Sequence, residues 1–424
     1  MRSVPEQHRM NAAKLKSRAV LCVVGFAILN GIIVWEVRDH ILQGYGDFAS
    51  FYTAGKILQQ GHAARLYDRG LQWEIQQGFA STVNIRSGPL PYIRPPFEAL
   101  LFWPLAYLNY PAAYLVWTLT KISILLIFPF FLPKDLRLGF ESSAGTYLQG
   151  LLCLGFFPVA FDLLQGQDSI LLLLVLTMMF WFLERGQSFQ AGSMLGLGLF
   201  KFHLIIPMFL VFLLRGKVKV VLGFLSAAVV LLSLSVVLAG WDACLNYPKY
   251  LWQLNQAPAL AGFKSYAMPN IRGLLTPLLG RGRIPLVAQG LLWALSAGGV
   301  AMVARLWQFA SGNAVLNRVG FSFCIVVTIV TSYYANSYDL TLLFLVLLLG
   351  GSVLLPSTAI KSWPRTVFVA CAALLLFSPL YWILALRVDQ FNWCAVILLF
   401  LAASLAAVLR QDEELPSGRK TLTS

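Results

Sequence analysis

The stretch GDFASFYTAG, residues 46–55, follows the first long apolar run of the chain at 19–36 and lies within its longest early polar segment. Aromatic residues recur near helical spacing within residues 48–58, with polar residues between them. This pattern predicts an interfacial helix whose apolar face lies on a bilayer. Asp47 stands at the start of that helix, where the preceding apolar run reaches the membrane surface. It is therefore a candidate catalytic base that can reach a substrate carried in the lipid.

A second role suits the same aspartate. Asp before an amphipathic run is a good helix N-cap, because its side chain accepts hydrogen bonds from the first free backbone N–H groups. These N–H groups would also stabilise the carboxylate of Asp47 and weaken it as a base. The sequence leaves both roles open.

The composition of the whole chain predicts an all-α polytopic membrane protein. Of its 424 residues, 58% are hydrophobic and 12% are charged. Apolar runs long enough to cross a bilayer, which needs ~18 or more residues, recur along the whole length. We expect about twelve transmembrane helices, within a range of roughly ten to thirteen, in a single domain over residues 1–410.

The apolar runs after the first one define the expected spans. They lie at roughly 97–108, 111–132, 145–164, 169–183, 190–214, 218–239, 285–304, 316–334, 340–355, 366–386 and 392–409. The run at 97–108 is short for a span and predicts either a thin helix or a re-entrant one. The Gly-rich segment 189–215 is a second place where the helix pattern is irregular.

The positive charge of the chain follows its predicted topology. The formal net charge is +14, but the basic residues cluster in short loops between apolar runs, which is the positive-inside distribution and gives no reason to expect a nucleic-acid partner. Basic residues precede the first apolar run and no small-x-small cleavage site follows it, so this run predicts a retained helix with a cytoplasmic N-terminus. We therefore expect a multi-pass protein of the cell (inner) membrane, with extracytoplasmic segments at 37–94, 240–284 and 336–339. The polar tail at 411–424 is expected in the cytoplasm.

Several polar residues interrupt the apolar part of the chain. They are Asp162, Gln165, Gln167, Asp168, Lys201, His203 and Asp339. Ionisable groups at membrane depth cost several kcal/mol, so they normally face a cavity or a partner. Three of them fit a purely structural position equally well, because Asp162 and Asp168 flank a Gln-Gly-Gln turn and Lys201 could snorkel from a shifted helix end. Five of the six cysteines fall within apolar runs, and no disulfide framework, metal spacing or cofactor fingerprint occurs.

Short motifs recur in order along the chain. They are Asp47-Phe48 with Tyr52-x-Ala54-Gly55, Leu66-Tyr67-Asp68, Tyr92-x-Arg94-Pro95-Pro96-Phe97 before Pro104-Leu105, Gly166-Gln167-x-Ser169, Met268-Pro269-Asn270 with Gly273-Leu274-Leu275, and Ser337-Tyr338-Asp339-Leu340. Together they resemble glycosyltransferase family 87, over nearly the whole chain. Two positions depart from the family pattern, since the family often has Asn at Ser169 and a Lys-Pro pair where this chain has Lys201-Phe202.

The resemblance implies a membrane enzyme of the GT-C superfamily. Such an enzyme moves a sugar from a polyprenyl-phosphate donor to a lipid or glycan acceptor at the extracytoplasmic face. Mannose is the best-attested sugar of the family, and other hexoses or a pentose fit the residues equally well. Relatives use an acidic residue of the first external loop as base, a position that Asp47 matches. A single base predicts inversion at the anomeric carbon, and no Asp-x-Asp pair occurs, which is compatible with transfer without a metal or other cofactor.

The resemblance and the chemistry together give the candidate site residues. Asp47 removes the proton of the acceptor hydroxyl. Cations must stabilise the departing lipid phosphate, and Arg94, Lys201, Lys264 and Arg272 are candidates. Arg94 is preferred because it opens a motif at the membrane surface, and arginine can also hold phosphate through two hydrogen bonds. The predicted substrate-binding residues are Tyr52, Tyr67, Asp68, Tyr92, Arg94, Gln167, Lys201, Asn270, Arg272, Tyr338 and Asp339.

A polytopic carrier is the alternative. Twelve spans with a buried lysine and aspartate also fit a secondary transporter or a flippase for lipid-linked glycans. Carriers tend to have two halves with matching loops, and the long segments 37–94 and 240–284 break that symmetry. The sequence therefore favours the enzyme.

Overall fold

The chain folds into a bundle of α-helices. A computed structural model describes residues 4–80, 88–136, 142–256, 264–279, 285–309, 313–356, 360–385 and 390–414, and these ranges contain helices and turns but no β-strand. The predicted all-α polytopic architecture is confirmed. Of the predicted tail at 411–424, residues 411–414 continue the last helix and the rest lies outside the described residues.

Eight helical segments of the described residues are long and apolar enough to cross a membrane. They are residues Val20–Leu42 of α1 (Val4–Leu42), Tyr110–Phe131 with α5 (Tyr110–Ile127), Ser188–Leu214 with α9 (Ser188–Leu197) and α10 (Phe202–Leu214), α11 (Val218–Ala239), residues Leu286–Gln308 of α14 (Leu286–Phe309), α15 (Ala314–Thr331), Ser337–Leu354 with η11 (Ser337–Leu342) and α16 (Leu343–Leu354), and Phe391–Gln411 with α19 (Cys394–Glu414).

The remaining predicted runs form broken or shorter helices. The run at 145–164 becomes α6 (Ser143–Leu152) and α7 (Phe157–Gln165), bent by 79° and counted as a possible ninth span. The runs at 169–183 and 366–386 become the short apolar helices α8 (Ser169–Glu184) and α17 (Ser362–Leu376), the latter followed by α18 (Ser378–Ile383). Within the described ranges, the number of helices long enough to cross a membrane is therefore lower than the twelve expected, because breaks shorten several of the apolar runs.

The run at 97–108 does not form one continuous helix. Proline interrupts it, and it folds as the short pieces η3 (Pro96–Glu98), α4 (Ala99–Phe102) and η4 (Pro104–Tyr107), which pack against α2 (Phe48–Gln59). A Cβ on Gly55 of α2 would lie 2.4 Å from the carbonyl oxygen of Phe102, so the two backbones touch. Ten of the residues of α2 are buried, which places this helix inside a cluster rather than flat on a surface as predicted.

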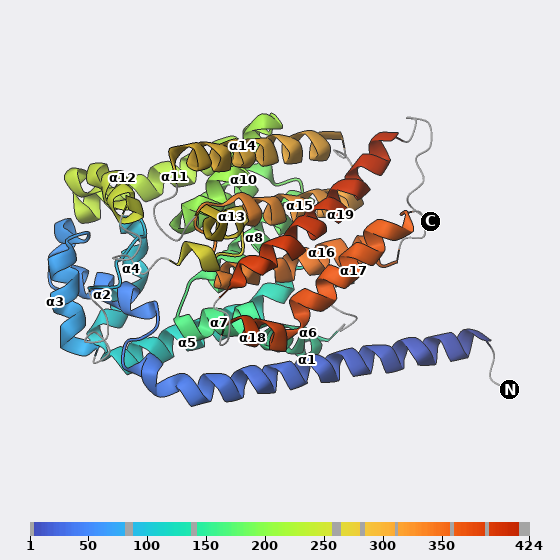
Figure 1. The fold of residues 1–424 in the computed structure, drawn as a ribbon, viewed down its shortest axis with the longest axis horizontal. Helices are drawn as coiled ribbons and strands as arrows, with labels where there is room; N and C mark the ends of the chain where they lie inside the picture. Colours follow the sequence, from blue (N-terminus) through green and yellow to red (C-terminus); the bar gives the residue numbers. More distant parts are fainter. Residues whose placement is uncertain are drawn as a thin grey trace.

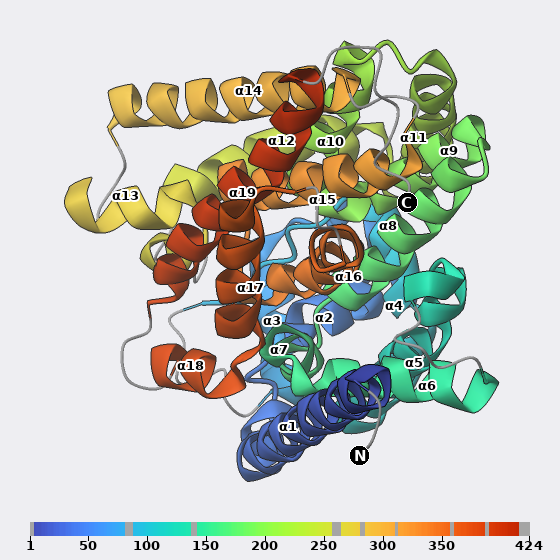
Figure 2. The ribbon, with the colours of Figure 1, turned by 90° about the vertical axis from the view of Figure 1, so that its right-hand side faces the viewer.

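The polar segments gather at one end of the bundle. Figure 1 shows α2, α3 (Arg69–Phe79), α4 and α12 (Trp241–Gln256) together at one end, with the start of α1 and the end of α19 at the other. Figure 2 views α16 nearly along its axis in the middle of the bundle, with α1 and α14 at opposite edges. The short helix α13 (Ile271–Leu279) follows α12 in the chain. The start of α1 and the end of α19 thus lie at the same end of the bundle.

Glycines bring α9 and α11 into close contact. A Cβ on Gly192 of α9 would lie 1.9 Å from the carbonyl oxygen of Val220, and one on Gly223 of α11 would lie 2.0 Å from that of Phe189. Small residues at such positions let membrane helices approach each other and pack tightly. The segment that carries Lys201 is held in place by this contact, because it follows α9 directly.

We expect Gly192→Ala to destabilise the protein, because the added methyl group has no space between α9 and α11. Overpacking of this kind costs roughly 1–3 kcal/mol. Thermal unfolding of the purified protein in detergent should therefore begin at a lower temperature than for the wild type. Gly25→Ala in α1, where a Cβ meets nothing within 4 Å, is the matched control and should leave the midpoint unchanged. Equal midpoints for both variants would contradict this account of the packing.

Candidate active site

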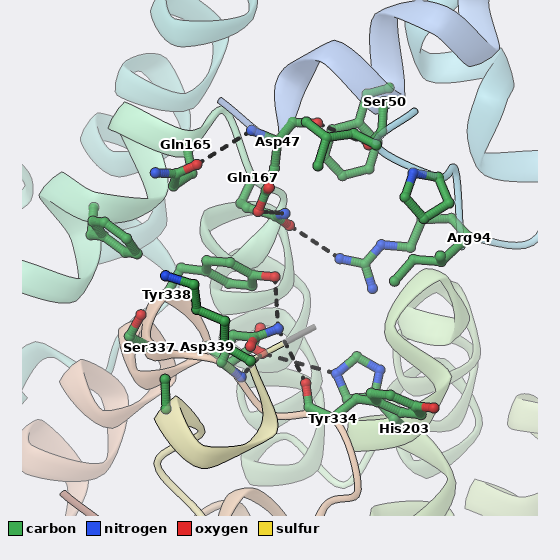
Figure 3. A pocket seen from close by; sticks show the side chains of 18 of the residues that line it. Asp47, Ser50, Arg94, Gln165, Gln167, His203, Tyr334, Ser337, Tyr338 and Asp339 are labelled. Atoms are coloured by element: carbon green, nitrogen blue, oxygen red, sulfur yellow. Dashed lines mark hydrogen bonds and ion pairs between the residues drawn. The ribbon is translucent and has the colours of Figure 1, made fainter. Parts of the chain in front are cut away.

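A cavity of about 500 Å³ lies where the predicted polar segments meet. Its walls come from all three segments expected on one face, together with the turn after α7 and the start of α10. Polar side chains that line it include Asp47, Ser50, Arg94, Gln165, Gln167, His203, Lys264, Tyr334, Asn336, Ser337, Tyr338 and Asp339. Figure 3 shows ten of the lining residues labelled, with Asp47 and His203 at opposite edges of the group.

Asp47 is held at the cavity wall by two glutamines. Its Oδ2 accepts a hydrogen bond of 2.7 Å from Nε2 of Gln167, and its backbone N–H donates to Oε1 of Gln165 at 3.3 Å. The residue has helical backbone angles (φ −60°, ψ −20°), and its side chain makes no capping hydrogen bond to α2. Of the two roles left open by the sequence, capping is therefore not used.

The two glutamines are presented by a glycine turn between α7 and α8. Gly166 has a φ of +68°, and a Cβ at this position would lie 2.4 Å from the Cβ of Phe48. A side chain is therefore excluded both by the backbone conformation and by α2. The turn is tied to α5, since Nε1 of Trp117 donates to the carbonyl of Gly166 at 2.9 Å.

Arg94 links the wall that carries Asp47 to the interior of the bundle. Its Nη2 donates to Oε1 of Gln167 at 3.2 Å and to Oδ1 of Asp168 at 3.0 Å. Its own backbone carbonyl accepts a hydrogen bond of 2.8 Å from the hydroxyl of Tyr67. Burial disfavours the charged guanidinium, but the carboxylates of Asp168 and Glu98 raise the pKa of Arg94 above its usual value. The arginine therefore stays positively charged beside the cavity.

Lys201 lies behind the cavity and is completely buried. Its Nζ forms ion pairs with Asp168, at 2.8 Å, and with Asp339, and donates to Oγ of Ser169 at 2.6 Å. Both ion-pair partners of this lysine are therefore carboxylates, and they belong to two separate segments of the sequence. Snorkelling is thereby excluded, because the ammonium group points into the bundle and is paired there.

Glu98 is a buried carboxyl group that the sequence analysis missed. It is 0% exposed, its Oε2 lies 3.9 Å from Nε of Arg94, and the hydroxyl of Tyr92 lies 3.3 Å from the same oxygen. Burial and the neighbouring Asp168 carboxylate raise the pKa of Glu98 well above its usual range. A lone glutamate within the apolar run 97–108 was the signal that could have identified it.

Lys121 and Asp162 form a second buried pair. Nζ of Lys121 donates to Oδ1 of Asp162 at 3.0 Å and to its backbone carbonyl at 2.8 Å, while Oδ2 of Asp162 accepts from the backbone N–H of Ser169 at 2.8 Å. Both charged side chains are fully buried. The pair fixes the two ends of the glycine turn to α5, and a single lysine in the apolar run 111–132 was the overlooked signal.

Six other predicted residues are not among the described residues that line the cavity: Tyr52, Tyr67, Asp68, Tyr92, Asn270 and Arg272. The hydroxyl of Tyr52 donates to the carbonyl of Leu108 at 2.7 Å, and Asp68 caps α3 by accepting from the N–H groups of Gly70 and Leu71. Arg65 and these N–H groups lower the pKa of Asp68. Asn270 donates to the carbonyl of Ser332 at 2.9 Å, and Arg272 stacks 3.9 Å from the ring centre of Tyr333. Each of these side chains thus has a structural partner.

The last motif brings Tyr338 and Asp339 to the far wall of the cavity. The hydroxyl of Tyr338 accepts a hydrogen bond of 2.8 Å from Nδ2 of Asn336, and Oδ2 of Asp339 accepts one of the same length from the backbone N–H of Asn336. Within the described part of the chain, no group of three or more His, Cys, Asp or Glu side chains is arranged to hold a metal ion.

Comparison with known proteins gives one match. The family model described as Glycosyltransferase family 87 matches residues 92–332, which is more than half of the chain. The matched range includes Arg94, Glu98, Asp168 and Lys201, and ends before Tyr338. No curated protein and no solved structure matches the chain.

We expect Lys121→Met to destabilise the fold strongly, because Asp162 would remain buried without its partner. Removing one member of a buried ion pair costs about 3–5 kcal/mol. The double variant Lys121→Met/Asp162→Asn removes the isolated charge as well and should recover part of that loss in thermal unfolding. Lys56→Met, at a partly exposed position of α2, serves as the control. A double variant less stable than Lys121→Met would show that the pair does not act as a charge pair.

Proposed function

The chain belongs to glycosyltransferase family 87, and we propose that it transfers a sugar from a polyprenyl-phosphate donor to a lipid or glycan acceptor. We propose a hexosyl or pentosyl unit, with mannose as the first donor to test. The cavity supports this proposal because it combines a carboxylate, cations and aromatic rings at one end of a membrane bundle. The alternative considered from the sequence was a carrier protein. The match to a glycosyltransferase family does not support that alternative.

The observation that carries the proposal is the position of Asp47. Its carboxylate lies at the cavity wall, accepts a hydrogen bond of 2.7 Å from Gln167 and does not cap its helix. A carboxylate at the wall of such a cavity is placed to take a proton from an acceptor hydroxyl. General base catalysis of this kind contributes roughly 10²–10⁴-fold to a rate.

One carboxylate is sufficient for the proposed reaction. The acceptor oxygen attacks the anomeric carbon, its proton passes to Asp47, and the bond from that carbon to the phosphate oxygen breaks with its electron pair on the phosphate. A glycosidase needs a second carboxylic acid to protonate a poor leaving group, whereas a sugar phosphate already carries a good one. Attack from the face opposite the phosphate inverts the anomeric configuration.

Arg94 is the residue that we propose for contact with the donor phosphate. It lines the cavity one side chain away from Asp47, since Gln167 bonds to both. A fixed cation near the developing negative charge stabilises the transition state more than it does the bound donor. Lys201 is paired with Asp168 and Asp339 behind the wall, so we propose that it positions this wall rather than holding the phosphate.

We propose that the cavity opens at the extracytoplasmic face of the cell membrane. The distribution of basic loops supports this orientation, as does the position of the cavity elements at the end of the bundle away from the start of α1 and the end of α19 (Figure 1). Lipid-linked sugars are substrates that a cavity at the membrane boundary can take from the bilayer.

We expect Asp47→Asn to abolish sugar transfer, because an amide of the same shape cannot accept the proton. The rate of transfer from undecaprenyl-phosphate mannose to acceptors in a membrane extract should fall by about 10²-fold or more. Asp39→Asn, which changes an exposed carboxylate in α1, should leave the rate as it is. The folded state of both variants is checked by gel filtration and thermal unfolding in detergent.

The results of this experiment separate the possible functions. Transfer by the wild type that persists in Asp47→Asn would remove Asp47 from the role of base. A wild type that transfers none of a panel of polyprenyl-phosphate mannose, glucose and arabinose would contradict the proposed donor class. Lipid movement across a vesicle membrane without formation of a glycosidic bond would identify a carrier.

We also expect cysteine labelling to locate the cavity outside the cytoplasm. In a background without the six native cysteines, Gln60→Cys lies beside the cavity elements on an exposed turn, and Arg410→Cys lies near the end of α19. A membrane-impermeant maleimide applied to intact cells should label residue 60 and should label residue 410 only after permeabilisation. The opposite pattern would overturn the proposed orientation.

A further inference from the structure

The helix α12 has three sides of different character. An exposed apolar side carries Trp241, Leu245 and Trp252, which are 60%, 61% and 56% exposed and recur at spacings of four and seven residues. Next to it runs an exposed polar side, formed by Asp242, Asn246, Lys249 and Gln253. The third side packs on the protein and holds the buried residues of the helix, Ala243, Tyr250 and Leu254. A helix that lies in a membrane interface has this pattern, because lipid, water and protein each meet one side of it.

The exposed apolar surface of α11 continues onto this side of α12. The helix α11 is long and apolar enough to cross a membrane, and its Val230 and Val237 are 64% and 85% exposed. Gly240 ends this helix with a φ of +83°, a conformation that glycine adopts easily. Trp241 follows directly, at the boundary where tryptophan is enriched in membrane proteins. In Figure 1 α12 lies at the end of the bundle that holds the polar segments.

The inner side of α12 forms part of the cavity wall. Leu251 and Leu254 both line the cavity. The hydroxyl of Tyr247 donates a hydrogen bond of 2.8 Å to the carbonyl of Ile93, another lining residue, and thereby ties the helix to this wall. Trp252, the neighbour of Leu251 in the chain, faces outward. The cavity and the exposed apolar side are therefore separated by the width of one helix, about 10 Å.

A lipid-linked donor needs such a boundary. Its sugar and phosphate require a polar cavity, whereas its long apolar chain is most stable in the bilayer. The chain must therefore leave the cavity where a wall borders the lipid. At η13 (Phe391–Trp393) a lining residue also adjoins an exposed tryptophan, but the rings of Phe157 and Phe161 pack against Phe391 at 6.0 and 6.1 Å. Aromatic side chains thus fill that side, which favours the side of α12.

We propose that α12 lies in the outer interface of the bilayer on the side of Trp241, Leu245 and Trp252, and that the polyprenyl chain of the donor passes from the cavity into the bilayer along this helix. The first part depends only on the surface of α12, whereas the second rests on the proposed function. The interfacial role that the sequence predicted for residues 48–58 is thereby assigned to α12, because α2 is buried.

Fluorescence quenching tests the position of α12 without requiring sugar transfer. In the background without the six native cysteines, a bimane label is attached to Trp252→Cys on the apolar side or to Lys249→Cys on the polar side as the matched control. Val237→Cys in α11 is the reference for a residue in lipid. In vesicles of phosphatidylcholine and phosphatidylglycerol, brominated phosphatidylcholine should quench the label at residue 252 nearly as strongly as at 237, and the label at 249 much less. Quenching at 252 that is no stronger than at 249 would overturn the first part.

Photolabelling tests the route of the polyprenyl chain. The photoreactive residue p-benzoylphenylalanine replaces either Trp252 or Trp393, two exposed tryptophans of 56% and 58% exposure that adjoin the cavity on different sides. The full-length variants are reconstituted in the same vesicles and illuminated with radiolabelled undecaprenyl-phosphate mannose. We expect stronger labelling from residue 252 than from residue 393, and we expect excess unlabelled undecaprenyl phosphate to suppress it, because a chain bound at one site can be displaced.

Each outcome of the photolabelling decides a separate point. Labelling from residue 393 that equals or exceeds that from 252, or labelling from 252 that excess undecaprenyl phosphate does not suppress, would overturn the route along α12. The same photoreactive residue in place of Val230, an exposed residue of α11, measures the background from donor dissolved in the bilayer. Labelling from both 252 and 393 no stronger than this background would contradict the proposed donor class and the route with it, while the quenching result still decides where α12 lies.

Discussion

The pairing of four buried charges is the constraint on which this structure depends. Arg94 and Lys201 contribute the positive charges, and Asp168 and Asp339 the negative ones. None of these residues is more than 5% exposed, and a buried charge without a partner is costly. Because the four residues come from separate segments, their ion pairs hold these segments against one another. Two of the four, Arg94 and Asp339, also line the cavity.

The same packing explains why the helices break where they do. In a membrane, irregular backbone is tolerated only where it is buried in protein or lines a cavity. The glycine turn after α7 and the 3₁₀ segment η11 both line the cavity, and η8 (Gly198–Lys201) lies beside it. The carbonyl groups freed at the end of α7 are satisfied by α5, since the hydroxyl of Tyr114 bonds to the carbonyls of Leu163 and Leu164. One regular helix thus supports the irregular turn that presents the two glutamines.

The sequence predicted the helical membrane architecture better than it predicted where the helices are interrupted. Apolar runs and ionisable residues at membrane depth follow from local composition, so the polytopic fold and the burial of Lys201 and Asp339 could be anticipated. The partners of these charges could not, because a pair such as Lys201 with Asp339 joins segments that are 138 positions apart. Glu98 and Lys121 were missed since one charge changes the mean hydropathy of a run very little. The burial of α2 depends on a backbone contact between Gly55 and Phe102 that no periodicity encodes.

The amide of Gln167 separates the two charges that we propose to act in sugar transfer, Asp47 and Arg94. A base and a phosphate-binding cation must both face the same sugar, yet a direct ion pair between Asp47 and Arg94 would stabilise the carboxylate and make it a weaker base. Gln167 offers its Nε2 to Asp47 and its Oε1 to Arg94, so a neutral group separates the charges while fixing both. Asp168, from the interior side, binds the arginine instead. In the proposed reaction, the base and the cation are therefore held at a separation set by one side chain.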